Sequence, residues 1–168
     1  LLRAMDFDNA EMVALLLGAG ADPNESSTPG YNALHHAALR GVGTEVAELV
    51  ARAGADPESV YETLMPHAYA RLVGAPDVLA VLNEIGAPQD VPEPLAPLLG
   101  AAGRLHVDPA AIPEPLRGLL TDLVHREGTL SRIKELVQVG FPWDAPDSMV
   151  VTPVQAAGWV GVPELLRY

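Results

Sequence analysis

Apolar residues recur along the chain in short stripes that have the spacing of one helix face. The clearest stripes are residues 11–24 (EMVALLLGAGADPN), 45–58 (EVAELVARAGADPE), 77–88 (DVLAVLNEIGAP) and 131–142 (SRIKELVQVGFP). Their closing glycines Gly20, Gly54 and Gly86 are separated by 34 and 32 residues. Glycine readily adopts the left-handed conformation that ends many helices. The pattern therefore predicts a helix that stops at each glycine.

A second, shorter pattern precedes these stripes and also ends in glycine. It comprises residues 32–41 (NALHHAALRG), 65–74 (MPHAYARLVG) and 152–161 (TPVQAAGWVG). Small alanines on one side allow two antiparallel helices to approach closely, and the glycine supplies a tight turn between them. The chain is therefore predicted to be all-α and built from helix pairs. In the second helices, we expect Leu16 and Leu49 to be buried and Gly54 to be left-handed.

This arrangement resembles the ankyrin repeat, in which T-P-L-H-x-A-A-x-x-G is followed by a Glu-led helix, G-A-D and a hairpin. Leu1, Leu34 and His67 occupy successive copies of the leucine position at intervals of 33 residues. The resemblance covers residues 1–88 and about 119–168. It implies one α-solenoid over residues 1–168, with short β-hairpin or loop tips. Its expected units span about 1–26, 27–59 and 60–88, followed by an irregular unit at 89–146 and a partial unit at 147–168.

The chain departs from the family pattern at several points. Asn32 and Ala33 replace Thr-Pro, His67 stands at a leucine position, and residues 41–44 carry one extra residue between two helices. Between Pro88 and Gly118 the pattern is lost and seven prolines occur. We expect a distorted repeat with an insertion here, with helices at 93–102 and about 114–126. A disordered linker is the alternative, but its leucines and Ile112 make the segment too apolar to favour it.

Composition excludes several classes of function. Ten basic against twenty-two acidic residues give a net charge of −12, which disfavours nucleic acid and anionic membranes as partners. The chain has no cysteine, so disulfides and thiolate zinc sites are excluded. No apolar run is long enough to span a membrane. We expect a cytoplasmic protein.

The sequence offers no set of residues that predicts catalysis or a cofactor. His35 and His36 are adjacent, so on a helix they point about 100° apart and do not chelate one metal. The remaining histidines lack metal-ligand spacing, phosphate-binding glycine motifs are absent, and the serines fit helix caps and loops. The acidic residues near Asp6 are interpreted as a solvated face. We expect a non-enzymatic chain with no metal and no cofactor.

The family resemblance implies a structural role for His35, which would hydrogen-bond backbone groups and tie neighbouring loops. It also implies a protein-binding surface on the concave face. The positions that would face this groove include Tyr31, His36, Arg40, Tyr61, Glu62, Tyr69, Met149 and Trp159. Tyrosine and tryptophan are frequent interface hot spots. For Tyr69 and Trp159, packing against adjacent helices is the alternative. Trp143 is assigned to the core.

The predicted function is protein–protein interaction, and the acidic charge favours a partner with a basic patch. One alternative is that the chain serves as a targeting or regulatory arm of a larger enzyme. Another is that the insertion at 88–118 forms a small-ligand pocket. Because Leu1 falls inside one expected helix and the chain stops inside another, we expect a longer array. Eroded outer repeats are the alternative.

Overall fold

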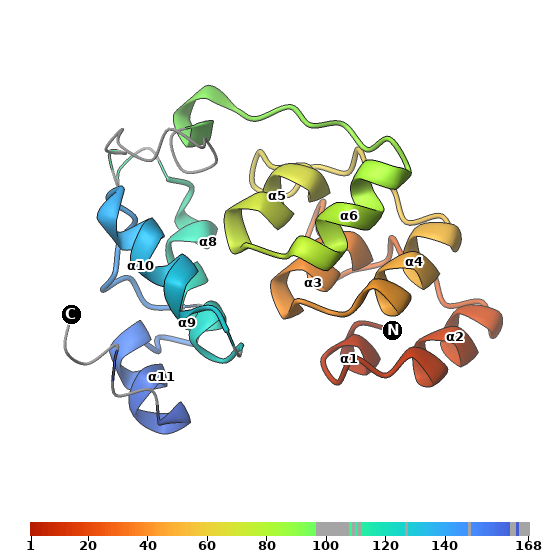
Figure 1. The fold of residues 1–168 in the computed structure, drawn as a ribbon, viewed down its shortest axis with the longest axis horizontal. Helices are drawn as coiled ribbons and strands as arrows, with labels where there is room; N and C mark the ends of the chain where they lie inside the picture. Colours follow the sequence, from red (N-terminus) through yellow and green to blue (C-terminus); the bar gives the residue numbers. More distant parts are fainter. Residues whose placement is uncertain are drawn as a thin grey trace. The chain divides into compact units, whose positions relative to one another are not determined.

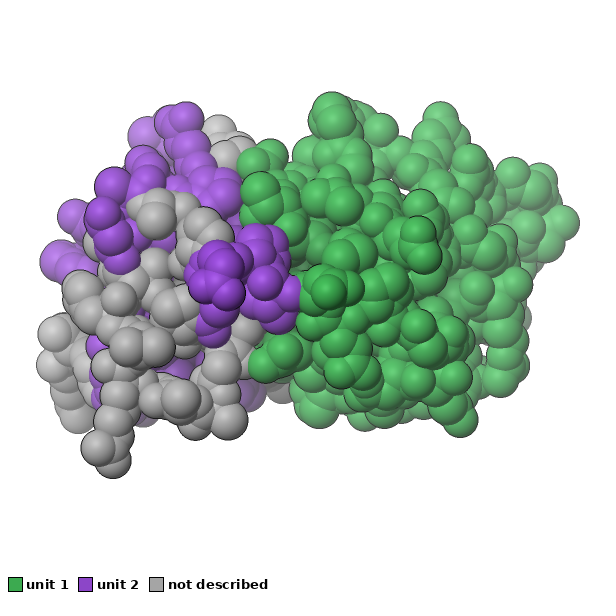
Figure 2. All heavy atoms as spheres, turned by 90° about the horizontal axis from the view of Figure 1, so that it is seen from above, with its two compact units in different colours: residues 1–90 green, residues 91–168 purple. Residues whose placement is uncertain are grey.

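The computed structural model describes residues 1–96, 108, 110, 112–126, 128–147, 149–161 and 164. The chain divides into two compact units, Leu1–Asp90 and Val91–Tyr168 (Figure 2). Within the described residues the fold is all-α, and the only β-type pairing is an isolated antiparallel bridge between Tyr61 and Leu64. The expectation of a single continuous array over 1–168 stays a prediction.

The first unit contains three helix pairs (Figure 1). Its helices are α1 (Leu2–Met5), α2 (Ala10–Gly18), α3 (Ala33–Arg40), α4 (Thr44–Arg52), α5 (Pro66–Val73) and α6 (Pro76–Glu84). The first helices of the pairs contact one another, α1 with α3 and α3 with α5, and the second helices likewise, α2 with α4 and α4 with α6. The helices thus form two rows, and the loops that precede α3 and α5 lie beside the first row.

Local sequence accounts for where α3 and α5 begin and end. Asn32 caps α3 by accepting bonds from the backbone N–H groups of Leu34 and His35, and α5 begins with a proline at its first turn. Gly41 and Gly74 end the two helices in the left-handed conformation, with φ of 64° and 67°. These are the tight turns that the sequence predicts between the helices of each pair.

The glycines after the second helices also behave as predicted. Gly20, Gly54 and Gly86 have φ of 92°, 91° and 70°, in the region that side chains other than glycine rarely adopt. The backbone therefore reverses direction at the same point after α2, α4 and α6. After Gly20 and Gly54 the chain continues into the loops that precede α3 and α5.

The buried stripes of α2 and α4 differ from the prediction for Leu16 and Leu49. Both leucines are only half-buried. The buried residue of α2 is Val13, and α4 buries Val46, Ala47 and Val50 instead. The buried face of each helix is therefore rotated relative to the predicted one, and short valine and alanine side chains form it. The two leucines lie on the flank of that stripe.

The second unit contains the short 3-10 turn η1 (Glu93–Leu95) and the helices α8 (Glu114–Arg117), α9 (Leu119–Val124), α10 (Leu130–Gln138) and α11 (Pro153–Val160). Helix α9 contacts α8, α10 and α11. In the described part of the helix expected at 93–102, residues 93–95 form a 3-10 turn and Ala96 is helical, while residues 97–102 lie outside the described residues. Leu95 and Ile112 are buried, as expected from their apolar character.

The helix expected at 114–126 is interrupted at Gly118, which separates α8 from α9. A side chain at this position would begin 2.7 Å from the Cα atom of Asp147 and 2.9 Å from the carbonyl oxygen of Pro146. Glycine is thus required here by a close backbone approach. A loop from a distant part of the sequence passes against the break.

The assignment of Trp143 to the core is wrong, because its side chain is 58% exposed. Phe141 is buried in its place, directly after Gly140. The left-handed glycine, with φ of 99°, directs the next side chain inward, and two residues later the chain has moved to the surface. Among the helices that the structure describes, none is long and apolar enough to cross a membrane.

Candidate functional site

An aromatic cluster lies where the loops of the first unit meet α3 and α5. The ring of Tyr31 contacts Tyr61 and Tyr69 edge-on, with centroids 5.0 and 6.5 Å apart, and stacks on His35 at 5.7 Å. The rings of Tyr61 and Tyr69 are 5.9 Å apart. Tyr31 also meets His36 edge-on at 5.9 Å. Edge-to-face contacts of this kind hold aromatic rings in fixed orientations.

His35 ties this cluster to the next helix pair. Its Nε2 lies 3.0 Å from the carbonyl oxygen of Leu64, so Nε2 carries the proton and donates it. Its Nδ1 then accepts from the backbone N–H of Asn32 and completes the capping box of α3. Burial lowers the pKa of His35 to about 4, although the bond to Leu64 raises it. This contact between successive loops is the role that the family resemblance implies.

Amide side chains hold consecutive loops together in the same region. The Nδ2 group of Asn32 donates to the carbonyl oxygen of Asp56 at 2.7 Å. The backbone N–H of Asp56 in turn donates to Oδ1 of Asn24 at 2.7 Å, and Nδ2 of Asn24 donates to the carbonyl oxygen of Gly54. The loops that carry Tyr31 and Tyr61 are therefore fixed by side-chain bonds as well as by ring contacts.

The same unusual backbone conformation occurs two residues before the N-caps of α3, α5 and α11. Gly30, Thr63 and Val150 occupy this position with φ of 73°, 71° and 63°. Only the first is glycine, so the other two place a β-branched side chain in a conformation that disfavours it. Thr63 lies in a tight turn closed by two backbone bonds between Tyr61 and Leu64, of 2.8 and 2.9 Å.

Glu62 precedes Thr63 in this turn and also has a positive φ, of 48°. The turn therefore holds two consecutive left-handed residues, a geometry for which Asn-Gly is the usual pair. Glu62 is half-buried and Thr63 is exposed. The loop thus carries a carboxylate and a hydroxyl beside Tyr61, at a cost in backbone strain.

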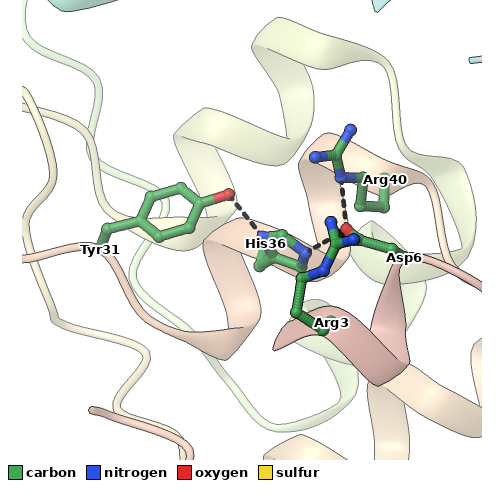
Figure 3. Close-up of polar contacts among 5 residues, drawn as sticks. All are labelled: Arg3, Asp6, Tyr31, His36 and Arg40. Carbon is green, nitrogen blue, oxygen red and sulfur yellow. Dashed lines mark hydrogen bonds and ion pairs between the residues drawn. The ribbon is translucent and has the colours of Figure 1, made fainter. Parts of the chain in front are cut away.

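A chain of polar contacts extends from Tyr31 to α1 (Figure 3). The hydroxyl of Tyr31 lies 3.1 Å from Nδ1 of His36, and Nε2 of His36 lies 2.9 Å from Oδ1 of Asp6. Two arginines pair with the same carboxylate. Nε of Arg40 is 2.8 Å from Oδ1, and Nη1 of Arg3 is 2.8 Å from Oδ2.

Protonation in this network follows from burial and charge. Burial raises the pKa of Asp6, but the hydrogen bond from His36 and the charges of Arg40 and Arg3 outweigh it and hold the pKa below its usual value. Burial lowers the pKa of His36, although its bond to Asp6 opposes this. At neutral pH, His36 is therefore neutral. Its Nε2–H donates to the carboxylate, and its Nδ1 accepts from the hydroxyl of Tyr31.

The structure joins five predicted site residues of the first unit in one cluster, which comprises Tyr31, His36, Arg40, Tyr61 and Tyr69, and Glu62 follows Tyr61 in the chain. Tyr31, Tyr61 and Glu62 are half-buried, so part of each side chain is open to a partner. Tyr69 and His36 are buried, with 2% and 8% of their surface exposed. For Tyr69, this is the packing that the alternative interpretation expects.

The two predicted site residues of the second unit are exposed. Met149 lies in the loop before α11 and is 77% exposed, and Trp159 lies on α11 and is 72% exposed. Val150, next to Met149 in the chain, is exposed to the same extent.

The role of Asp6 was not predicted from the sequence. We expected Asp6 to belong to a solvated acidic face, but it is an internal partner of His36, Arg40 and Arg3. The signal was weak, because Asp6 and His36 are 30 residues apart and no short motif joins them. The contact between α1 and α3 brings these side chains together.

The second unit has a shallow apolar hollow of about 50 Å³. It is lined by Leu120, Val124, Ile133, Val137, Trp143, Pro153 and Val154. None of these residues belongs to the segment 88–118 for which we considered a ligand pocket, and residues 97–107 lie outside the described part of the chain. Within the described residues, no group of three histidine or acidic side chains is arranged to hold a metal ion.

Comparison with known proteins adds no relationship to this geometry. No family model matches the chain, and no curated protein matches it.

Proposed function

We propose that this chain is a non-enzymatic protein-binding module of ankyrin-like helix pairs. Its binding face consists of the loops before α3 and α5 and the adjoining residues of α3. Three features support the ankyrin-like interpretation. The helices of the first unit form two rows, a left-handed glycine follows each second helix, and Gly30 and Thr63 share one conformation at an interval of 33 residues.

The observation that carries the proposal is the convergence of predicted groove residues. Tyr31, His36, Arg40, Tyr61 and Tyr69 come from two different helix pairs, and ring contacts, a hydrogen bond and an ion pair with Asp6 join them in one cluster. Aromatic side chains gathered in this way offer a large contact area at a low cost in conformational entropy.

The exposure of each side chain divides the cluster into contacts and supports. Tyr31, Tyr61, Glu62 and Arg40 are the proposed contacts, because each retains accessible surface. Tyr69, His35 and His36 are buried beneath them and hold them in place. A face whose side chains are already ordered loses little freedom on binding.

The proposed partner presents a basic segment to this face. The first unit carries thirteen acidic residues against four basic ones within residues 1–90. Such a field attracts a positive segment and speeds encounter at low ionic strength. The strained turn that retains Glu62 and Thr63 beside Tyr61 offers a carboxylate for a lysine or arginine of that segment.

The test begins with capture of a partner on the immobilised chain and its identification by mass spectrometry. The partner is then titrated against purified variants. Tyr31→Ala and Tyr61→Ala should each weaken binding by about 1–3 kcal/mol. Glu62→Lys should mainly slow association and reduce its dependence on salt.

Glu48→Ala is the matched control, because Glu48 lies on α4 in the other row and pairs with Arg52. It should bind like the wild type. Trp159→Ala then reports whether the exposed tryptophan of the second unit takes part. Wild-type affinity in both tyrosine variants, together with a loss in Glu48→Ala, would place the partner on the other side.

A further inference from the structure

Arg40 and Arg3 leave a positive charge on a strongly acidic unit. Asp6 contributes one negative charge, the two guanidinium groups contribute two positive charges, and His36 is neutral at pH 7. The network therefore carries one surplus positive charge. Elsewhere in the first unit acidic side chains outnumber basic ones by twelve to two.

The guanidinium of Arg40 forms an ion pair with Asp6 and remains open at its outer edge, although its buried Nε atom makes no hydrogen bond. Its Nε atom is buried against Oδ1 of Asp6 at 2.8 Å, and its side chain as a whole is 36% exposed. In Figure 3 the two terminal nitrogens point away from Asp6. Among the described residues, no hydrogen bond or ion pair is made by these two nitrogens.

Asp6 is the common support of both arginines. Arg3 pairs with its Oδ2 atom and is 89% exposed, while Arg40 pairs with Oδ1, so two guanidinium groups from α1 and α3 adjoin one carboxylate. His36 and Tyr31 hold that carboxylate from the other side. The support for Arg40 therefore extends into the aromatic cluster, and His36 and Tyr31 are positioning residues.

We infer that Arg40, with Arg3 beside it, forms a binding subsite for a carboxylate group. The two terminal nitrogens of a guanidinium match the two oxygens of a carboxylate and bind it in a bidentate geometry. One carboxylate also balances the single surplus charge. A phosphate dianion would leave a negative excess in a unit that is already acidic.

The natural source of the carboxylate is the bound protein, through an acidic side chain or its C-terminus, and this step rests on the proposed function. A basic segment that also carries one carboxylate would meet Glu62 with its positive charge and Arg40 with its negative charge. Two contacts of opposite sign set the direction and register of the bound segment.

The subsite is tested without any partner, by titrating the full chain with sodium acetate. Ionic strength is held constant with chloride at pH 7, and ¹H–¹⁵N spectra follow the Nε–H signal of Arg40, which burial protects from exchange with water. Its assignment comes from its loss in Arg40→Lys. The signal should shift saturably with acetate, and inorganic phosphate should require a higher concentration for half-saturation.

Three variants distinguish the contributions of Arg3 and Arg40 to acetate binding from a non-specific effect of acetate. Arg3→Gln should raise the acetate concentration at half-saturation severalfold. Arg40→Lys keeps the charge but loses the paired nitrogens. In this variant the amide signal of Gly41 should no longer respond to acetate, while the remaining signals should show that the protein is still folded. Arg52→Gln removes an exposed arginine on α4 and should leave the titration unchanged.

Three results would overturn the carboxylate subsite. These are a shift that rises linearly without saturation, an equal response at the Nε–H of Arg52, and half-saturation by phosphate at a lower concentration than by acetate. The protein-binding proposal is independent of this outcome. A partner that binds through Tyr31 and Tyr61 without using Arg40 would leave that proposal intact.

Discussion

At the scale of single residues, the first unit stores backbone strain in the turn before α5. Thr63 takes the conformation that glycine takes in the preceding loop, with φ of 71° against 73° for Gly30. A left-handed conformation costs a residue with a side chain roughly 1–2 kcal/mol. Strain of this kind is often retained at functional positions. A substitution at Thr63 therefore tests the effect of this strain on stability separately from its effect on binding.

Thr63→Gly should raise the free energy of unfolding by up to about 1 kcal/mol. Relief of the left-handed strain exceeds the added freedom that glycine gives the unfolded chain, which is worth about 0.5–1 kcal/mol. Urea unfolding at pH 7 measures the change. Gly30→Thr is the matched reverse substitution and should be strongly destabilising, because its Cβ would begin 1.8 Å from the carbonyl oxygen of Val60. A loss of stability in Thr63→Gly would show that the threonine side chain contributes more than the strain costs.

His35 should make stability depend on pH between about 6.5 and 4. Its pKa falls from 6.5 to about 4 on folding because it is buried, so in this range the unfolded chain binds the extra proton. The contribution of His35 to the free energy of unfolding is therefore complete above pH 6.5 and is lost as the pH falls toward 4. For a fully buried group this loss is about 3 kcal/mol. Urea unfolding at pH 7, 6, 5 and 4 measures this slope. His35→Gln should be less stable at pH 7 but should show a smaller slope, and equal slopes would contradict the assignment.

At the scale of elements, the chain uses one helix-start motif in two surroundings. Asn32 caps α3 and Thr152 caps α11, and each forms a capping box with the residue three positions later. Asn32 is buried and also donates to the carbonyl oxygen of Asp56 in the next loop. Thr152 caps its own helix from a half-buried position. The first cap joins two helix pairs as well as starting a helix.

Asn32→Ala should therefore cost more than Thr152→Ala. A lost cap alone costs about 0.5–2 kcal/mol, which is the expectation for Thr152→Ala. Asn32→Ala also leaves the carbonyl of Asp56 without its donor, which adds about 1–3 kcal/mol. Unfolding monitored by circular dichroism compares the two variants. Equal losses would mean that the bond to Asp56 adds nothing beyond the local cap.

At the scale of the whole molecule, the first unit has a hydrophobic core of its own. Residues 1–90 form one compact unit with three helix pairs, and their buried residues include Leu34, Leu72 and Leu82. Such a unit has what it needs to fold as an independent segment. The proposed contacts Tyr31, Tyr61, Glu62 and Arg40 all lie within it.

A chain of residues 1–90 should retain helical circular dichroism and unfold cooperatively in urea. Its helix pairs bury their apolar faces against one another, as neighbouring repeats do in stacked arrays. The fragment should also bind the identified partner. Because the fragment lacks Trp159, any loss in its affinity should match the loss caused by Trp159→Ala in the full chain. A fragment without a cooperative transition would show that residues 91–168 are needed for the fold.

The sequence by itself determined the elements whose causes are local. Glycines in the left-handed conformation, caps and prolines act within a few residues, so the turns at Gly41, Gly54 and Gly74 were predictable. The family resemblance implied that Tyr31, Tyr61 and their neighbours belong to one face, and the two rings lie 5.0 Å apart. The structural role of His35 came from the family pattern, and its bond to Leu64 agrees with it.

Tertiary structure decided which side chains are buried and which distant groups meet. Leu49 and Trp143 were expected in the core, but packing of the neighbouring rows and loops set the helix phase and turned both away from full burial. Asp6 was expected to be an exposed acid. The packing of α1 beside α3 instead places it against His36 and Arg40. Spacing along a chain describes one element at a time. The charge, orientation and exposure of a side chain depend on the groups that folding brings to it from elsewhere.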